Sequence, residues 1–205
     1  SFANIGLGFD REHFGETLTS LLFGCTLPGP FGSASQSVVN MSADTSDAEM
    51  VQISIGQGTT LMTPLHLNML TCAIANGGDV MIPMVISRIE SVSGMTIKSY
   101  APEVYANLMT EEEAAFLTEL MTGVIESGTG DFLNAAEYTS AGKTGSAEYN
   151  NVKGDSHAWF TGFAPAEDPQ VCVTIIIEGA GAGGDYAVPI AKRIFDAYLA
   201  YKEYS

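Results

Sequence analysis

The residues most capable of chemistry are three neighbours, Lys143, Thr144 and Gly145, in a segment expected to form a β-strand. A lysine ammonium supplies a positive charge and three hydrogen-bond donors, and the threonine hydroxyl adds a further donor. Together these groups suit a carboxylate ligand. A glycine in the third place removes a side chain where an extended peptide could pair with the strand. The alternative is an exposed edge strand with a protective lysine and a bulge-forming glycine.

Two further patterns near this strand are typical of nucleophilic catalysis in other proteins. Ser140-Ala141-Gly142-Lys143 has the Ser-x-x-Lys spacing in which a lysine activates a serine. In a strand, residues three apart point to opposite faces, so we interpret this match as coincidence. His157 could face Ser146 across a hairpin and form a Ser-His pair, but no third member of a triad is placed beside them.

The other candidate residues predict no metal, cofactor or disulfide. His13 and His66 have no ligand-like partners, and no spacing of Asp and Glu suggests a metal site. The glycine-rich stretch 179–184 precedes a helix but lacks the Lys-Ser/Thr of a phosphate loop, so we expect a flexible connection near a substrate groove. An odd number of cysteines without Cys-x-x-Cys spacing favours neither a disulfide framework nor a zinc site. These cysteines are Cys25, Cys72 and Cys172.

Helices and strands that could position these residues follow one another from residue 51 onward. The expected elements are a helix at 64–76, a hairpin of 84–89 and 95–100, a helix at 111–126, strands at 138–148, 157–164 and 171–178, and a helix at about 189–201. Thr63-Pro64 and the capping box that begins at Thr110 indicate where the first two helices start. Short polar loops between the last three strands favour antiparallel pairing. The order predicts an α+β fold, an antiparallel sheet flanked by helices, in a single domain over 1–205 whose first 50 residues are irregular and loop-rich.

Composition limits the partners that the protein can have. The net charge of −16, with only 8 Lys and Arg among 205 residues, argues against nucleic acid and against anionic lipid headgroups. The hydrophobic fraction of 46% predicts a folded globular body. No apolar run is long enough to span a bilayer, and the chain begins at Ser1 without a targeting segment, as a processed fragment would.

Five stretches, in the same order over residues 53–200, resemble the monofunctional, class B penicillin-binding proteins. They are Ile55-Gly56-Gln57-Gly58 with Thr63-Pro64-Leu65, Ala75-Asn76-Gly77-Gly78, Gly128-Thr129-Gly130, Lys143-Thr144-Gly145, and His157-Ala158-Trp159-Phe160-Thr161-Gly162-Phe163-Ala164-Pro165. Lys-Thr-Gly is the third active-site motif of these proteins. Each stretch is weak alone, but the ordered set is specific.

The resemblance implies a role for each residue of the third motif. Lys143 would organise proton transfer around the nucleophile and the substrate carboxylate, and so act in catalysis. Thr144 would hold the terminal carboxylate of a D-Ala-D-Ala stem peptide or of a β-lactam, with Gly145 beside it in the substrate-binding strand. The backbone N–H of Ser146 would supply one oxyanion-hole donor, a contact typically worth about 3 kcal/mol. The Ser146 hydroxyl would add a second carboxylate contact.

Two motifs of the family have no credible match in this chain. The Ser-x-x-Lys nucleophile motif and the Ser-x-Asn motif are missing, and Tyr105-Ala106-Asn107 mimics the second of these only at the wrong place in the order. The segment from Ser1 to Gly8 resembles the sequence just after the second motif. We therefore expect the C-terminal portion of a transpeptidase domain, inactive alone.

The resemblance implies that the parent protein is a serine D,D-transpeptidase that cross-links peptidoglycan at the extracytoplasmic face of the bacterial membrane. An N-terminal segment outside this chain would anchor it. Its partners would be the D-Ala-D-Ala stem peptide, β-lactams and other cell-wall synthesis proteins. The alternatives are a non-catalytic sensor of β-lactams or muropeptides, and a β-lactamase, which the long motif series fits less well.

Overall fold

The computed structural model describes residues 2–30, 34–150, 152 and 154–203. Its centre is a three-stranded antiparallel sheet made of β5 (Ala141–Glu148), β6 (Ser156–Ala164) and β7 (Val171–Ile177) in the spatial order β5-β6-β7. The three predicted strands and their antiparallel pairing are therefore confirmed. Because sequence neighbours are also neighbours in space, short connections suffice to join them.

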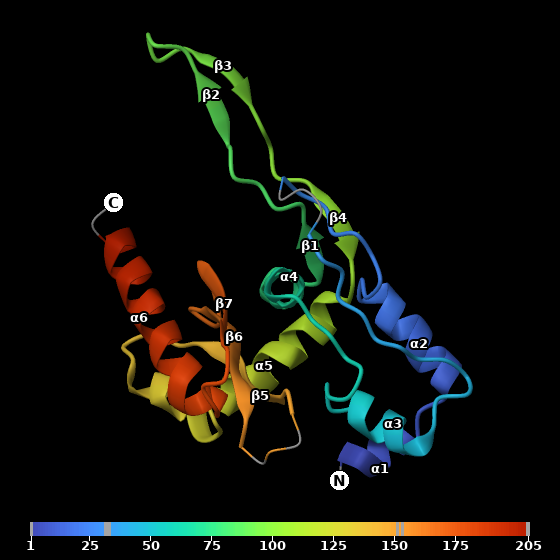
Figure 1. Ribbon diagram of the computed structural model, residues 1–205. Helices are drawn as coiled ribbons and strands as arrows, with labels where there is room; N and C mark the ends of the chain where they lie inside the picture. The colour runs from blue at the N-terminus through green and yellow to red at the C-terminus, as the bar shows by residue number, and fades with distance from the viewer. Residues whose placement is uncertain (1, 31–33, 151, 153, 204–205) are drawn as a thin grey trace.

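Helices cover both faces of this sheet, as Figure 1 shows. Along β6, Phe163 packs with Met121 of α5 (Glu111–Ser127) and Ile74 of α4 (Pro64–Ala75). Phe160 points the other way and packs with Phe195 of α6 (Gly183–Glu203). Residues of odd and even number leave a strand on opposite faces, so each buried phenylalanine of β6 belongs to a different core. The predicted α+β layers are thus confirmed.

The first two predicted helices begin at the capping residues that the sequence indicates. The Thr63 side chain accepts a hydrogen bond from the backbone N–H of His66 at the start of α4. Thr110 and Glu113 form a reciprocal capping box at the start of α5. Both side chains satisfy backbone donors that a helix leaves without partners in its first turn. A short 3₁₀ helix, η1 (Asp131–Ala135), follows α5.

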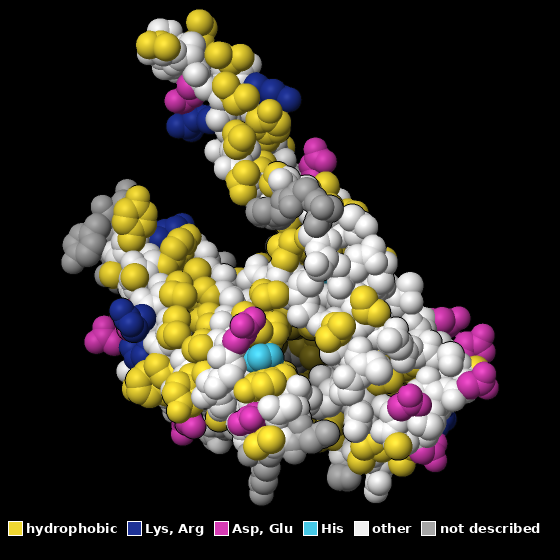
Figure 2. Space-filling view, viewed as in Figure 1, with side chains coloured by type: hydrophobic (Ala, Val, Ile, Leu, Met, Phe, Trp, Pro, Cys, Tyr) yellow, Lys and Arg dark blue, Asp and Glu magenta, His cyan; other side chains and the backbone are white. Residues whose placement is uncertain are grey.

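A long hairpin arm projects from this body (Figure 1). The arm consists of β2 (Arg88–Glu90) and β3 (Thr96–Ser99), which pair antiparallel, and its strands are shorter than the predicted 84–89 and 95–100. At its base β1 (Asp79–Met81) pairs with β4 (Val104–Asn107), which sequence reasoning did not predict. Hydrophobic side chains cover much of the visible arm in Figure 2. Val92, Met95 and Ile97, which belong to the hairpin, are all well exposed.

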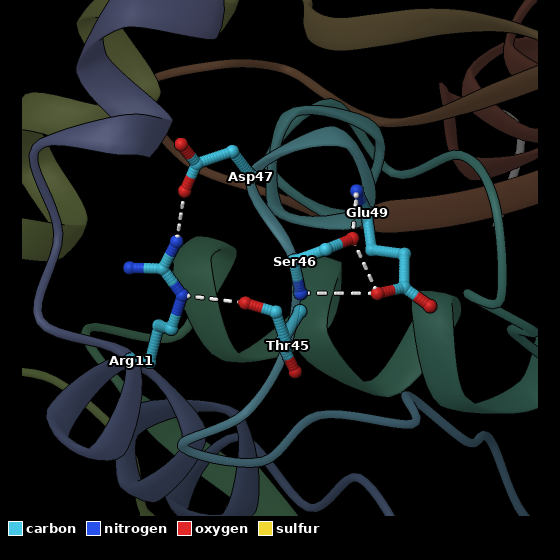
Figure 3. Close-up of polar contacts among 5 residues, drawn as sticks. All are labelled: Arg11, Thr45, Ser46, Asp47 and Glu49. Atoms are coloured by element: carbon cyan, nitrogen blue, oxygen red, sulfur yellow. Dashed lines mark hydrogen bonds and ion pairs between the residues drawn. The ribbon is translucent and has the colours of Figure 1, made fainter.

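The expectation of an irregular stretch at residues 1–50 needs correction. It contains α1 (Phe2–Leu7) and α2 (Arg11–Ser20), and α3 (Asp47–Ile53) begins at its end. Figure 3 shows that Arg11 pairs with the Asp47 carboxylate and donates to the Thr45 carbonyl, at 2.7 Å from Nε, so α2 is tied to the start of α3. None of the α2 residues is buried, which explains the weak hydrophobic period of this region.

The last helix also begins earlier than predicted. The sequence predicts its start at about Pro189, where a helical stripe of large side chains begins. Instead α6 begins at Gly183 and Pro189 lies inside it. A proline six residues into a helix leaves the carbonyl four residues before it, that of Asp185, without a helical donor. Asp185 is exposed, so solvent can reach this end of the helix. Within the described residues, none of the helices is long and apolar enough to cross a membrane.

Candidate active site around the Lys-Thr-Gly strand

The side chains of the predicted site leave β5 on two faces. Thr144 lies opposite Phe160, which packs toward α6, and Ser146 lies opposite Ala158 of the same core. Lys143 lies opposite Thr161, whose hydroxyl bonds Thr71 of α4 at 2.7 Å. Paired residues share a face of the sheet. Two hydroxyls therefore share the α6 side, while Lys143 and Gly145 belong to the α4 side.

The Thr144 and Ser146 side chains line an open pocket of ≈ 570 Å³. The lining is completed by the turn after α5, the start of η1 and the start of α6. These residues are Gly128, Thr129, Asp131, Phe132, Ala182, Gly183, Gly184, Asp185 and Pro189. The pocket is large enough for a small ligand. The Thr144 and Ser146 hydroxyls can donate to an anion, whereas the lining residues Asp131 and Asp185 favour cationic groups.

Both hydroxyls have a hydrogen-bond partner in the protein. The Thr144 Oγ1 shares a hydrogen bond with Thr129 Oγ1. The backbone N–H of Gly183 donates to Ser146 Oγ at 3.3 Å. A Cβ on Gly183 would lie 2.3 Å from the Trp159 carbonyl oxygen, so only glycine allows the start of α6 to approach the sheet this closely. Within the glycine-rich stretch 179–184, which we expect to be a flexible connection near a substrate groove, Gly183 and Gly184 are thus closely packed and line the pocket.

Backbone groups of β5 point toward its free edge, because among the described residues β6 is its only neighbouring strand. The Ser146 carbonyl accepts a hydrogen bond from Gln57 Nε2 at 3.1 Å, and the Thr144 carbonyl accepts one from Lys143 Nζ at 2.7 Å. Both carbonyls thus face away from β6. In an antiparallel strand the N–H and C=O of one residue point to the same side. The N–H of Ser146 is therefore directed to the free edge, where an extended peptide could meet it.

Lys143 and Gly145 occupy the other side of the strand. Lys143 is exposed, and among the described residues its ammonium donates only to the main-chain oxygen of Thr144. A Cβ on Gly145 would lie 3.2 Å from the Cβ of Trp159 across the pair, closer than is usual. Gly145 therefore leaves space for its cross-strand neighbour Trp159. This is a second reason for a glycine here, beside the space for a paired peptide that the sequence suggests.

Neither of the two other nucleophile patterns, Ser140 with Lys143 and Ser146 with His157, has its two side chains together. Ser140 is 3% exposed and lies just before β5, and its hydroxyl has no hydrogen-bond partner among the described residues. Because Lys143 leaves the strand on the opposite face, it cannot activate this serine. His157 lies opposite Ala147 rather than Ser146, accepts a hydrogen bond from the Gly179 N–H at 3.0 Å, and stacks on Tyr149. The Ser-His pair that we considered across the hairpin is therefore wrong.

The remaining histidine and cysteine candidates are not part of this pocket. His66 is fully buried in α4, where its Nε2 lies 2.8 Å from the Leu21 carbonyl, and burial lowers the pKa of its imidazole. Cys25, Cys72 and Cys172 are free. Within the part of the chain that the structure describes, no group of three or more His, Cys, Asp and Glu is placed to hold a metal ion. The sequence included Thr129 and Gln57 in motifs but did not indicate that their side chains reach β5.

Comparisons with known proteins place this geometry in a family. The family model for the penicillin binding protein transpeptidase domain matches residues 3–196. The peptidoglycan D,D-transpeptidase MrdA of Acinetobacter baumannii is 34% identical over 165 residues, 74% of this chain and 24% of the relative. The D,D-transpeptidase PbpA of Mycolicibacterium smegmatis is 34% identical over 153 residues, 71% of this chain and 31% of the relative. The chain thus spans about a quarter to a third of the length of these relatives.

Solved structures agree with these relatives. The D,D-transpeptidase domain of a peptidoglycan glycosyltransferase from Eggerthella lenta has a TM-score of 0.85 at 26% identity, covering 98% of this chain and 50% of that chain. The imipenem acyl-enzyme complex of penicillin-binding protein A from M. tuberculosis has a TM-score of 0.84 at 28% identity, covering 97% of this chain and 44% of that chain. The match of both fold and sequence over nearly all of the chain shows that it belongs to the penicillin-binding protein transpeptidase family.

Proposed function

We propose that the chain is the C-terminal part of the transpeptidase domain of a serine D,D-transpeptidase that cross-links peptidoglycan stem peptides and binds penicillin. The observation that carries the proposal is the edge of β5. There the Thr144 and Ser146 hydroxyls face one open pocket while the N–H of Ser146 points to the free edge. An extended peptide with a terminal carboxylate needs hydroxyl donors for its end and a main-chain donor for its reacting carbonyl.

Each residue then has a distinct task. Thr144 and Ser146 bind the terminal carboxylate through their hydroxyls, since an ionised carboxylate only accepts hydrogen bonds. The N–H of Ser146 stabilises the oxyanion of the tetrahedral intermediate as one of two donors. Gly145 lies between Thr144 and Ser146 in β5, beside which the substrate would add as a further strand. Lys143 supplies a positive charge and proton-transfer capacity next to the reacting group.

The nucleophile lies outside this chain. The serine attacks the penultimate D-Ala carbonyl of one stem peptide, the peptide bond breaks, and D-Ala leaves with the proton it gains. An amine of a second stem peptide then attacks the acyl-enzyme, and the serine recovers its proton as the new peptide bond forms. The isolated chain is inactive on this view, because among the described residues the Ser140 hydroxyl has no hydrogen-bond partner and that of Ser146 accepts from the Gly183 N–H, so neither is bonded to a base.

The relatives support both the substrate and the location. Those described above are peptidoglycan D,D-transpeptidases by name. Penicillin-binding protein A of M. tuberculosis is solved as acyl-enzyme complexes of ceftriaxone, imipenem and penicillin G. Peptidoglycan is assembled outside the cytoplasmic membrane, so we place the parent protein at that face, held by an upstream anchor and in contact with other cell-wall synthesis proteins.

The test uses the full-length protein to which this chain belongs. It is incubated with fluorescent penicillin, and, separately, with a D-Ala-D-Ala stem peptide and an amine acceptor. We expect a stoichiometric adduct in the first assay and a cross-linked peptide with released D-Ala in the second. An adduct without any cross-linked product would favour a sensor, rapid release of penicilloic acid would favour a β-lactamase, and neither adduct nor product would contradict the proposal.

A further inference from the structure

The hydroxyl of Thr129 contacts that of Thr144 on the α6 side of β5. Thr129 belongs to the turn after α5, and its Oγ1 shares a hydrogen bond with Thr144 Oγ1. Both residues line the same pocket. Either hydroxyl can be the donor in this pair. Which of them donates decides whether Thr144 still has a proton to donate to a ligand.

A hydroxyl has one proton to give and two lone pairs to accept with. If Thr144 gives its proton to Thr129, only its lone pairs remain, and these repel a carboxylate. If Thr129 donates, the proton of Thr144 is free for the carboxylate. In the second case the hydrogen bonds run in one direction, from Thr129 to Thr144 to the ligand, and each strengthens the next.

Resting on the function proposed above, we propose that Thr129 is a positioning residue that makes the Thr144 hydroxyl a donor to the ligand carboxylate. Thr129 does not itself touch the ligand in this arrangement. It fixes the direction of a hydrogen bond and the rotamer of the side chain that does.

The turn that carries Thr129 is held firmly enough for this task. The N–H groups of Gly128 and Gly130 both donate to the Val124 carbonyl, each at 3.1 Å, at the end of α5. A Cβ on Gly184 would lie 2.6 Å from the Thr129 carbonyl oxygen, so the start of α6 packs closely against the turn. The hydrogen bonds to α5 and the close packing against α6 together limit the movement of the turn, and so keep the Thr129 hydroxyl within hydrogen-bond distance of Thr144.

Ser146 shows the same arrangement with an unambiguous direction. Its hydroxyl accepts from the backbone N–H of Gly183 at 3.3 Å, and a backbone N–H can only donate. The proton of Ser146 is therefore free. Because Ser146 and Thr144 share one face of β5, a protein donor to each hydroxyl leaves both protons directed to the same pocket. The parallel supports donation by Thr129.

The test measures second-order acylation rates of the full-length protein with benzylpenicillin and with its methyl ester, which lacks the negative charge. Thr129→Val keeps the shape of the side chain and removes the donor, and Thr129→Ala is a second hydroxyl-free variant. Thr129→Ser keeps the hydroxyl. Thr122→Val is the matched control, since the Thr122 hydroxyl bonds the Thr118 carbonyl within α5. Melting temperatures establish that each variant is folded.

We expect Thr129→Val and Thr129→Ala to lower the ratio of the acid rate to the ester rate about tenfold, because a charge-assisted hydrogen bond loses its support. Thr129→Ser and Thr122→Val should keep the wild-type ratio. Equal losses for acid and ester, or no loss, in folded variants would overturn the inference while leaving the proposed function in place. A wild-type protein that benzylpenicillin does not acylate would overturn both.

Discussion

The side-chain amide of Gln57 donates a hydrogen bond to the carbonyl oxygen of Ser146 at 3.1 Å, across a separation of 89 residues along the chain. The segment before α4 is thereby connected to the free edge of β5. Since this bond holds the main chain of the residue whose N–H points to the same edge, it stabilises the strand where a substrate would pair.

Gln57→Glu should therefore slow acylation of the full-length protein by benzylpenicillin. The carboxylate of the variant only accepts hydrogen bonds, so it would repel the carbonyl that the amide now supports. Loss of one such bond corresponds to about 1 kcal/mol, or a roughly fivefold lower rate. Gln170→Glu is the matched control, because that amide also donates to a carbonyl, Asp168, far from the site. Equal rates for both variants would contradict a role of Gln57 at the strand.

The 205-residue chain alone should form no covalent adduct with a β-lactam. An acyl-enzyme needs an activated nucleophile, and Ser140, the only residue in a Ser-x-x-Lys spacing, is buried on the face opposite Lys143. Intact-mass analysis after incubation with benzylpenicillin measures this directly. A stoichiometric mass gain on Ser140 or Ser146 would show that the nucleophile is inside this chain.

Lys143→Ala in the full-length protein should impair acylation far more than folding. Its exposed side chain leaves no cavity when truncated, so the free energy of unfolding should change by no more than about 0.5 kcal/mol. In the proposed function the ammonium faces a proton in transit and a substrate carboxylate in the transition state, so we expect a loss on the order of 10²-fold in rate, about 2.7 kcal/mol.

The control for this change is Lys98→Ala, which removes another exposed strand lysine, on the β2–β3 arm. It should leave the acylation rate unchanged. If Lys143 only guards an edge strand, its alanine variant should keep the rate and lose solubility. An unchanged rate in a normally folded Lys143→Ala protein would mean that the third motif is misaligned.

Protonation of His66 should destabilise the fold at mildly acidic pH. Burial lowers the pKa of His66 in the folded state below its unfolded value of about 6.5, against a smaller opposing effect of the Leu21 carbonyl. The unfolded chain then binds more protons than the folded one in the window between the two values. The stability from neutral His66 is complete above pH 6.5 and falls as the pH drops below it.

Urea unfolding at pH 7.5 and 5.5 measures this effect. His66→Gln, which can still donate to the Leu21 carbonyl, should flatten the difference between the two pH values. A wild-type protein with equal stability at both pH values would refute the prediction.

Two glycine-to-alanine changes should shift stability in opposite directions. A Cβ at Gly162 in β6 would lie 2.5 Å from the Ala141 carbonyl oxygen and 2.8 Å from Phe160, so Gly162→Ala should cost about 1–3 kcal/mol through overpacking. A Cβ at Gly123 in α5 would meet no atom within 4 Å, so Gly123→Ala should stabilise the helix by up to about 1 kcal/mol. Denaturant unfolding of both variants checks the signs, and a neutral Gly162→Ala would contradict the packing described.

Local sequence signals were sufficient for α4, α5 and the three central strands. Thr63 and Thr110 act on backbone groups three residues away, and the alternation of large residues in β6 reflects its two covered faces. The same kind of signal is present at Ser46, whose capping box with Glu49 starts α3 within the stretch predicted to be irregular. The predicted start of the last helix at about Pro189 is wrong, since α6 begins at Gly183 and continues through the proline.

The sequence by itself determined the order of the motifs, the antiparallel sheet and the strand that carries Lys143, Thr144 and Ser146, because these depend on near neighbours and on a period of two residues. It could not show what stands opposite each side chain. Only the tertiary structure showed that Thr129 bonds Thr144 and that Gln57 donates to the Ser146 carbonyl. It also showed that His157 lies opposite Ala147 and not opposite Ser146. Periodicity fixes the face on which a side chain leaves its strand, whereas packing between distant segments decides which partner it meets there.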